Sequence, residues 1–329
     1  MSAQSSPERV LITGATGGLG GALVREALSR GWQVRGTGRA AFDWSGVEYV
    51  RADLATSDCD LAALVGGCDT VIHNAALSAS WGTRAEFQRI NVTATHRLLE
   101  AAQQAGVKRF TFVSSPSIFA SFRDRIQIGP DDAPANPQLN HYARTKLEAE
   151  RRVRAANSAS MATCAIRPRA LVGEGDRVIV PRLIELARRP RVPLPRGGVA
   201  LLEPTDLRDA AWAVCEAAGR CEAIGGRALN ISGGQPIAAR DLAQAVADAL
   251  GTAPHFANLP AAPARIIATV LEGIARMTRA KNEPVLTRYT LAAMSNSQTF
   301  DLEPAQQLLG YEPRHDAIET LLTEVRNLA

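Results

Sequence analysis

Tyr142 and Lys146 stand four residues apart in the stretch NHYARTK (140–146), in a chain of 329 residues that has only four tyrosines and three lysines. If this stretch is helical, the two side chains lie on the same helix face. An ammonium group beside a phenol stabilises the phenolate and lowers the pKa of the phenol, which makes tyrosine a usable general acid or base. The spacing therefore predicts proton transfer by Tyr142, with Lys146 as the charge that supports it.

A hydroxyl that could hold the reacting oxygen follows the apolar stretch RFTFVSS (109–115). Ser115 stands at the end of this predicted strand, at the sheet edge where ligands bind in open α/β folds. Ser114 and Ser117 are the alternatives, and capping a turn is the structural role open to any of the three. We expect Ser115, Tyr142 and Lys146 to act together on a carbonyl oxygen.

A glycine-rich turn, TGATGGLG (13–20), follows the first apolar stretch, VLIT (10–13), and precedes a predicted helix. Its glycines suit three needs of a dinucleotide site: a tight turn, close approach of the backbone to a pyrophosphate, and close packing of helix on strand. The N–H groups at the start of the helix attract the phosphate charge. Lys146 would then also reach the ribose hydroxyls. The residues expected to bind the dinucleotide here are Gly14, Thr16, Gly17, Gly18, Leu19 and Gly20.

The end of the second predicted strand, WQVRGTG (32–38), indicates which dinucleotide binds. An acidic side chain at this point usually binds the ribose 2′-hydroxyl of NAD, whereas a 2′-phosphate requires a cation in its place. The strand has no carboxylate at its tip and is followed by Arg39, whose guanidinium suits a phosphate. The sequence thus favours NADP(H) over NAD(H), unless Arg39 is an ordinary surface residue.

Short β-branched stretches alternate with longer helical ones up to about residue 170. This rhythm, with continuous apolar strands, is typical of a parallel sheet covered by helices on both faces. We predict an α/β fold: a Rossmann-type, doubly wound parallel sheet as an NADP-binding domain in residues 1–170, and a smaller, mostly helical substrate-binding lobe in residues 171–329. Segments near 200–232, and RALNIS (227–232) in particular, are expected to return to the main sheet.

The predicted elements have the following bounds. The strands cover residues 10–13, 32–38, 70–75, 109–115 and 163–168, and the helices cover 18–30, 86–105, 141–156, 180–188, 206–219, 239–250 and 264–280.

The composition is that of an ordinary globular protein. Hydrophobic residues make up 46% of the chain, and no run approaches the roughly 20 apolar residues of a membrane span. The first nine residues, MSAQSSPER, lack the apolar core of a secretory signal, so a cytoplasmic location is the default expectation. Five cysteines without C-x-x-C spacing indicate reduced packing residues rather than disulfides or a metal site.

A net charge of +4 and a pI near 9.0 raise the question of nucleic-acid binding. The arginines are spread along the chain and interleaved with acids, as in residues 148–154, which include Glu150, so we expect solvated helix faces and no nucleic-acid site. The segment Ala264–Arg279, ARIIATVLEGIARMTR, has apolar residues at helical spacing with arginines around them. We expect it to pack on its own domain; contact with a membrane surface, or control of the entry of an acyl chain, is the alternative.

The chain resembles the extended short-chain dehydrogenases/reductases nearly from end to end. The motifs that carry this resemblance are TGATGGLG (13–20), ADL (52–54), HNAA (73–76), NVTAT (91–95), VSSPSIFAS (113–121), YARTK (142–146) and RPRALVGEGD (167–176). Within that superfamily it is most similar to the 3β-hydroxysteroid dehydrogenase-like branch, and especially to the bacterial 2-alkyl-3-oxoalkanoate reductases. The closer similarity is carried by residues 75–95, 113–119, 179–188, 283–294 and 300–314.

The resemblance implies roles for further residues and a homodimer formed through helices of the cofactor domain. Asn91 would be a structural partner of the catalytic set. The implied cofactor contacts are Asp53 and Leu54 at the adenine end, Asn74, Ala75 and Ala76 along the cofactor backbone, and Pro168 with the residues after it at the nicotinamide carboxamide. The chain departs from the family pattern at Ala94, Ala120, Glu174 and Pro204.

The residues and the resemblance together predict an NADPH-dependent ketoreductase that reduces a hydrophobic β-keto acid or related acyl ketone to the 3-hydroxy product. A 3β-hydroxysteroid-type alcohol dehydrogenase is the first alternative. A sugar-nucleotide epimerase or dehydratase is another, for which the second half has no specific nucleotide-sugar motif. A non-catalytic NADP-sensing protein is disfavoured by the presence of all three catalytic residues. Candidate walls of the substrate pocket, each of which could instead be ordinary core, are Trp81, Phe119, Val178 and Pro181.

Overall fold

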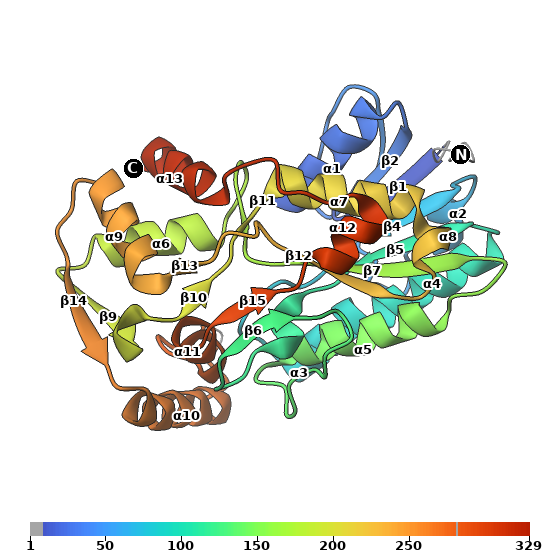
Figure 1. The fold of residues 1–329 in the computed structure, drawn as a ribbon. Coiled ribbons are helices and arrows are strands. Elements are labelled where there is room, and N and C mark those ends of the chain that lie inside the picture. Colours follow the sequence, from blue (N-terminus) through green and yellow to red (C-terminus); the bar gives the residue numbers. More distant parts are fainter. Residues whose placement is uncertain (1–8, 281) are drawn as a thin grey trace.

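A seven-stranded parallel sheet forms the centre of the molecule in the computed structural model, which describes residues 9–280 and 282–329 (Figure 1). Its order is β12-β7-β5-β4-β1-β2-β3, and each neighbouring pair is parallel. The predicted doubly wound sheet is confirmed, and β12 confirms the expected return of the RALNIS segment. The strands are β1 (Arg9–Thr13), β2 (Gln33–Gly38), β3 (Val47–Arg51), β4 (Thr70–His73), β5 (Arg109–Val113), β7 (Ala162–Pro168) and β12 (Ala228–Ile231).

Helices cover both faces of this sheet, which is why its inner strands are apolar along nearly their whole length. On one face, α1 (Gly18–Ser29) packs on α7 (Leu207–Gly219), and the two share a core with β1 and β7. On the other face, α2 (Leu61–Val65), α4 (Ala94–Gln104) and α5 (His141–Ala155) bury residues against β4 and β5. Figure 1 shows α1 and α7 above the sheet and α4 and α5 below it.

The strand order reverses between β1 and β4. The chain runs from β1 outward through β2 to β3, then returns to β4 on the other side of β1 and continues through β5 and β7. The connections therefore leave β1 and β4 in opposite directions, and the carboxyl ends of these two strands, at Thr13 and His73, border a crevice. Open α/β sheets bind their ligands at such a point.

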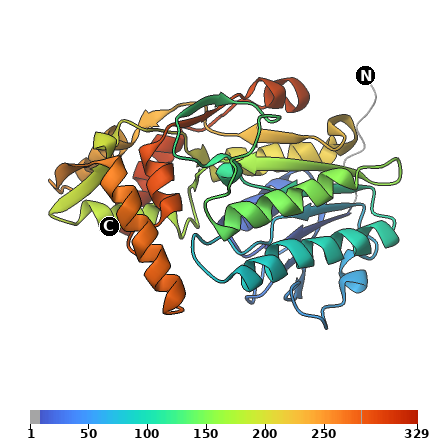
Figure 2. The same ribbon diagram turned by 90° about the horizontal axis from the view of Figure 1, so that it is seen from below.

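The rest of the second half forms a smaller lobe beside the main sheet (Figures 1 and 2). Its core lies between α6 (Ile179–Ala187), α9 (Ala239–Ala249) and α13 (Ala317–Leu328). The remaining helices are α3 (Arg84–Phe87), α8 (Cys221–Ile224), α10 (Ala261–Met277), α11 (Arg288–Ser295) and α12 (Glu303–Leu309). Short strands pair as β6 (Arg125–Ile128) with β15 (Gln298–Phe300), β8 (Leu171–Val172) with β11 (Thr205–Asp206), β9 (Arg191–Pro195) with β14 (His255–Leu259), and β10 (Leu201–Leu202) with β13 (Ile237–Ala238).

The helix expected over residues 264–280 forms as α10, and it packs on α11 of its own lobe as expected. Its buried positions are mainly small, and Ala264 and Ala268 lie against Leu291 of α11. The helix therefore packs mainly through its small residues, and most of the large apolar side chains at helical spacing face solvent. Solvent-exposed on α10 are Ile266, Ile267, Val270, Ile274 and Met277.

Candidate active site

The glycine turn lies between β1 and α1, where the sequence places it. Gly14 has φ +68°, a conformation that glycine adopts without strain, and its carbonyl oxygen accepts a hydrogen bond from the Gly17 N–H at 3.1 Å. A Cβ on Gly20 would lie 1.9 Å from that same carbonyl oxygen, so no larger residue fits there. Thr16, Gly18 and Leu19 complete the turn into α1. The N–H groups at the start of α1 are therefore free to face an anion.

The loop after β4 lies directly against this turn. A Cβ on Gly14 would come within 3.0 Å of the Ala75 backbone, and the Asn74 side chain donates a hydrogen bond to the Gly14 carbonyl oxygen at 3.3 Å. The backbone N–H groups of Asn74 and Ala75 both donate to the Thr13 hydroxyl, at 3.1 and 3.0 Å. The two loops that border the crevice, with Ala76 next in the chain, are thus held together by short contacts.

His73 connects this turn to the helix that follows. Because the Thr13 hydroxyl accepts two backbone hydrogen bonds, its own proton goes to His73 Nδ1, 2.8 Å away. His73 Nε2 then carries the ring proton and donates to the Thr95 hydroxyl at 2.8 Å, which in turn donates to the Asn91 carbonyl oxygen. Burial, with a smaller effect of the Lys146 charge, lowers the pKa of His73 to about 3. The imidazole is therefore neutral at physiological pH.

This burial gives a prediction for acid stability. The unfolded chain takes up a proton on His73 near pH 6.5, whereas the folded chain does so only near pH 3. Between these values the unfolded state binds more protons, so the free energy of unfolding falls as the pH drops, by up to roughly 1.4 kcal/mol per pH unit from this group. Urea unfolding of the wild type and His73→Gln between pH 7 and 5 should show that the free energy of unfolding falls less steeply with pH in the variant. Equal slopes in the two proteins would contradict this effect of His73 burial.

Arg39 lies exposed just beyond β2, and a second cationic side chain, Arg51, lies beside it. β3 places Arg51 opposite Gly38, and the Arg51 Nε donates to the Arg39 carbonyl oxygen at 2.8 Å. Asp53 begins the following turn, accepting a hydrogen bond from the Ala55 N–H at 2.9 Å, and Leu54 is buried beside it. Sequence reasoning missed Arg51 because its place depends on the register of β3, an element that it did not predict.

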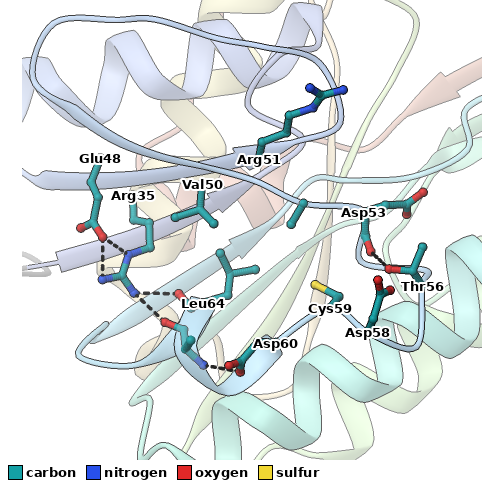
Figure 3. Close-up of a pocket in the computed structure, with 12 residues that line it drawn as sticks. Arg35, Glu48, Val50, Arg51, Asp53, Thr56, Asp58, Cys59, Asp60 and Leu64 are labelled. Atoms are coloured by element: carbon teal, nitrogen blue, oxygen red, sulfur yellow. Dashed lines mark hydrogen bonds and ion pairs between the residues drawn. The ribbon is translucent and has the colours of Figure 1, made fainter.

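A pocket of about 410 Å³ opens beside β3, away from the catalytic residues (Figure 3). Figure 3 shows the Arg35–Glu48 ion pair at one end and Asp53, Thr56 and Asp58 at the other. Arg51 and Asp53 line it, but neither of the catalytic side chains Ser115 and Tyr142 does. We therefore do not assign it to the reaction.

Tyr142 is the second residue of α5, and its hydroxyl shares hydrogen bonds with the hydroxyls of Ser115 and Ser78. The helix begins here because the Asn140 side chain accepts a hydrogen bond from the Ala143 N–H at 2.8 Å. Burial raises the pKa of Tyr142, and the two serine hydroxyls oppose that rise. Ser115 and Tyr142 thus meet as the sequence predicts, whereas Ser78, in the loop after β4, was not foreseen.

Lys146 lies one turn further along α5 and is almost completely buried. Its Nζ donates to the Val113 carbonyl oxygen at 2.5 Å and lies 4.1 Å from the centre of the Phe112 ring. Burial lowers the pKa of Lys146 to about 7, although the Glu150 carboxylate acts in the other direction. The lowered pKa of Tyr142 that the spacing predicts is not found here, because the ammonium is directed at Val113 and burial dominates the phenol.

Ser114 and Ser117 have different surroundings from Ser115. Ser114 donates to the buried Glu150 carboxylate at 2.6 Å, and Arg167 binds the same carboxylate through Nε at 2.8 Å. Ser117 is buried, and its N–H donates to the Ser115 hydroxyl at 3.2 Å. Ser115 is the serine that bonds to Tyr142. The expectation that Glu150 lies on a solvated face was wrong, because its charge is matched by a guanidinium from β7, which sequence spacing does not reveal.

Asn91 holds the Ser78 loop against α5. Its side chain accepts a hydrogen bond from the Leu77 N–H at 2.7 Å and donates to the Leu77 carbonyl oxygen at 3.3 Å and the Thr145 hydroxyl at 3.1 Å. Asn91 lies in a π-helical turn, η1 (Gln88–Thr93), within the helix that the sequence predicts as continuous. Such turns are frequent at functional sites. Asn91 thereby fixes the position of Ser78 relative to Tyr142.

Of the candidate pocket walls, Phe119 is completely buried in a core with Ile128 and Phe300, so its assignment to the pocket was wrong. Val178 and Pro181 are exposed at the start of α6. Trp81 lies in the loop that carries Ser78 and donates through Nε1 to the Ala280 carbonyl oxygen at 3.1 Å, just beyond α10. The loop that carries Ser78 is thus tied to the second lobe.

One departure from the family pattern, Glu174, has an ion-pair partner in the structure. Glu174 forms an exposed ion pair with Arg25 of α1 at 3.6 Å, and a Cβ on Gly18 would lie 2.8 Å from the Gly175 carbonyl oxygen. This loop therefore passes directly over the start of α1. Pro168 ends β7 and is buried, one residue before Arg169, which the sequence pattern did not mark by itself.

The parallel sheet, the glycine turn at a helix N-terminus and the Ser–Tyr–Lys residues at its edge define a short-chain dehydrogenase/reductase. Residues 10–232 match the family model of the NAD dependent epimerase/dehydratase family, and the chain belongs to this family. It is an NAD(P)-dependent oxidoreductase. The residues present fit such a cofactor, since the first turn of α1 has no side-chain cap and no acidic residue, and no carboxylate stands at the tip of β2.

Known proteins resemble this chain along most of its length. A 2-alkyl-3-oxoalkanoate reductase of Stenotrophomonas maltophilia (strain K279a) is 34% identical over 93% of this chain and 95% of the relative. A 3 beta-hydroxysteroid dehydrogenase/Delta 5-->4-isomerase of Mycobacterium tuberculosis (strain H37Rv) is 30% identical over 93% and 86%. The solved structure of MoeE5 with UDP-glucose and NAD superposes with a TM-score of 0.77 at 29% identity, over 98% of this chain and 100% of that one. The resemblance stated from the sequence is confirmed.

Proposed function

We propose that the protein is an NADPH-dependent ketoreductase that converts a hydrophobic β-keto acid, or a related acyl ketone, to its 3-hydroxy product. The observation that carries the proposal is the hydrogen-bonded pair Ser115–Tyr142, one helical turn from the buried Lys146. These three side chains lie at the edge of the sheet that also holds the glycine turn. A ketone oxygen between the two hydroxyls would receive one hydrogen bond from each.

Each catalytic residue has a defined role in this proposal. Bound NADPH would supply a hydride to the ketone carbon. Tyr142 donates its phenolic proton to the ketone oxygen, which becomes the product hydroxyl, and Ser115 polarises the same oxygen by a hydrogen bond. Lys146 binds the ribose hydroxyls, and its charge supports the phenolate that remains on Tyr142. Asn91 keeps this geometry by fixing the Ser78 loop to α5.

The preference for NADP(H) over NAD(H) is supported by two arginines. Arg39 and Arg51 stand together beyond the ends of β2 and β3, where the ribose 2′-phosphate of NADP would lie. A carboxylate there would repel that phosphate, and β2 offers none. Asp53, Leu54, Asn74, Ala75, Ala76 and Pro168 complete the proposed cofactor contacts.

The substrate class is supported by the relatives. The bacterial reductase is named for its action on 2-alkyl-3-oxoalkanoates, and that protein matches this chain nearly end to end. A 3β-hydroxysteroid-type dehydrogenase is the second candidate, favoured by the mycobacterial relative at 30% identity. A non-catalytic NADP-sensing protein would need no Ser115–Tyr142 pair, so the pair argues against it.

A substrate panel tests the proposed function. The oxidation of NADPH, with NADH in parallel, is followed by absorbance when the protein meets 2-alkyl-3-oxo acids, simple β-keto esters and 3-oxosteroids. We expect rapid oxidation with the 3-oxo acids and none without Tyr142. Turnover of 3-oxosteroids alone would select the second candidate. Tight NADPH binding without turnover of any class would overturn the ketoreductase.

We also propose that the exposed face of α10 rests on an anionic lipid surface, from which a hydrophobic substrate would enter. Figure 2 shows α10 standing out from the second lobe. Arg265, Arg276 and Arg279 are exposed and lie among or just beyond its apolar side chains, an arrangement that suits lipid headgroups. None of the helices in the described part of the chain is long and apolar enough to cross a membrane.

This contact predicts a loss of vesicle binding in an α10 variant. Changing Ile267 and Val270 together to aspartate should lower co-sedimentation with vesicles of phosphatidylglycerol and phosphatidylcholine about tenfold or more, because two exposed apolar contacts become charges. Val199→Asp, at an equally exposed valine elsewhere, serves as the control. Binding that is unchanged by the double substitution, or absent in the wild type, would overturn the contact.

The homodimer, the cytoplasmic location and the domain division at residue 170 stay predictions.

A further inference from the structure

Arg169 directly follows β7, at the carboxyl end of the sheet, and its backbone is fixed on both sides. Its N–H donates to the Ile231 carbonyl oxygen of β12 at 2.9 Å, and its own carbonyl oxygen accepts the Thr205 hydroxyl. The next residue, Ala170, has φ +42°, which turns the chain sharply away from the sheet. The Arg169 side chain therefore starts from a rigid point beside the proposed reaction site.

The guanidinium of Arg169 has no partner among residues 9–280 and 282–329. Its Nε is buried without a hydrogen bond, and no carboxylate of the described chain forms an ion pair with it. Two residues earlier, Arg167 binds Glu150 and the Pro130 carbonyl oxygen. Buried polar groups are nearly always paired, and an unpaired buried charge costs free energy. An unmatched cation at a sheet edge where ligands bind indicates that an anion belongs there.

Two side chains near Arg169 place it at the reaction site. Tyr289 of α11 lies close enough to both Arg169 and Tyr142 for its phenol to interact electrostatically with each. Glu203 is also near Arg169, but its carboxylate accepts the Phe300 N–H at 3.0 Å and a hydrogen bond from Ser232. Burial lowers the pKa of Arg169, while Tyr289 and then Glu203 act to raise it. Tyr289 is thus near both Arg169 and Tyr142.

We propose that Arg169 binds the carboxylate of the substrate and so selects a 3-oxo acid over a neutral ketone. This inference rests on the proposed ketoreductase function. A guanidinium binds a carboxylate through two parallel hydrogen bonds, which fixes the orientation of the acid as well as its position. In a 3-oxo acid the ketone is only two carbons from the carboxylate. Holding the carboxylate at Arg169 therefore directs the ketone oxygen toward Tyr142 and Ser115.

The pairing has a chemical consequence for the substrate. A positive charge favours the ionised form of a carboxylate. A 3-oxo acid loses carbon dioxide readily through its protonated form, in which the acid proton passes to the ketone oxygen. Arg169 would keep the acid ionised while Tyr142 delivers the proton to that oxygen instead. Tyr289, which lies near Arg169, would donate a third hydrogen bond to the same carboxylate.

The test compares a 2-alkyl-3-oxo acid with its methyl ester in the full-length protein. In the wild type, kcat/KM should be higher for the acid. In Arg169→Gln, kcat/KM for the acid should fall about 100-fold, which corresponds to the loss of two charge-assisted hydrogen bonds, while the value for the ester stays within about threefold. Arg169→Lys keeps the charge without the two-pronged geometry and should lose about tenfold on the acid only.

Controls distinguish carboxylate binding by Arg169 from effects on cofactor binding, on folding and on the reductase activity itself. The dissociation constant of NADPH and the Tm are measured for every variant, and Arg227→Gln removes an arginine at the opposite edge of the β7–β12 pair. Equal losses on acid and ester, or an equal weakening of NADPH binding, would overturn carboxylate binding by Arg169 while the reductase stands. Failure of the wild type to reduce either compound would overturn the proposed function itself. If Arg169→Gln does not fold, Arg169→Lys decides between the same outcomes.

Discussion

Replacing Tyr142 with phenylalanine is expected to lower kcat/KM for the ketone about 10³-fold, the range found for the loss of a positioned general acid. The substitution removes one oxygen and leaves the ring that packs at the start of α5. Ser115 would still polarise the ketone, but no group would deliver a proton as the hydride arrives. The measurement is the steady-state rate of NADPH oxidation together with the dissociation constant of NADPH, which should change little.

Tyr311→Phe is the matched control for this prediction. Its hydroxyl donates to the Ser232 carbonyl oxygen at 2.9 Å, and the residue is completely buried. Removing that hydroxyl should lower the free energy of unfolding by about 1 kcal/mol, because a buried carbonyl loses its partner, while the rate is kept. Tyr142→Phe should show the opposite pattern, with nearly unchanged stability. Loss of rate in both variants alike would mean that the effect is structural and would remove Tyr142 from the reaction.

The state of Lys146 bears on how this proton transfer depends on pH. Its pKa is lowered to about 7 by burial, so near neutral pH the Lys146 side chain is a mixture of the charged ammonium and the neutral amine. The sequence argument treated the lysine as a permanent charge, because spacing says nothing about burial. Glu150, one turn further along α5, is the group that opposes this lowering of the Lys146 pKa. Glu150 is in turn held by Arg167 and Ser114.

The elements that the sequence predicts well are those with a local cause. The apolar runs of β1, β4, β5 and β7 indicate buried parallel strands without knowledge of their neighbours. The glycine turn is recognisable because its requirements fall within eight consecutive residues. The Tyr142–Lys146 pair follows from helical spacing alone. In each case the physical constraint acts between residues close in the chain.

The residues that the sequence leaves open are those placed by long-range pairing. β3 is an edge strand whose side chains are half-buried or exposed, so its pattern, VEYVR, gives no continuous apolar run. Arg51 gains its place only from the pairing of β3 with β2. Ser78 reaches Tyr142 because Asn91 fixes its loop, and Arg169 is unpaired only because nearby carboxylates bind elsewhere. Residue type and spacing cannot show any of these relations.

Exchanging Arg39 for aspartate is expected to reverse the cofactor preference. The change removes a cation from the proposed 2′-phosphate site and supplies the carboxylate that a ribose 2′-hydroxyl would accept. We expect the ratio of kcat/KM with NADPH to kcat/KM with NADH to fall about 10²- to 10³-fold, since a charge-assisted contact is lost and a like-charge repulsion is added. Arg51→Gln should weaken NADPH alone, by about tenfold.

Dissociation constants measured by cofactor fluorescence at two salt concentrations would support this reading independently of turnover. Binding of NADPH, but not of NADH, should weaken as salt increases in the wild type, because the extra phosphate contacts exposed arginines. Lys108→Gln, at an exposed cation before β5 and at the other edge of the sheet, controls for the general charge of the protein. If Arg39→Asp and Arg51→Gln both leave the preference unchanged, the two arginines do not hold a 2′-phosphate. The absence of a carboxylate at the tip of β2 would then be the only support left for NADP(H).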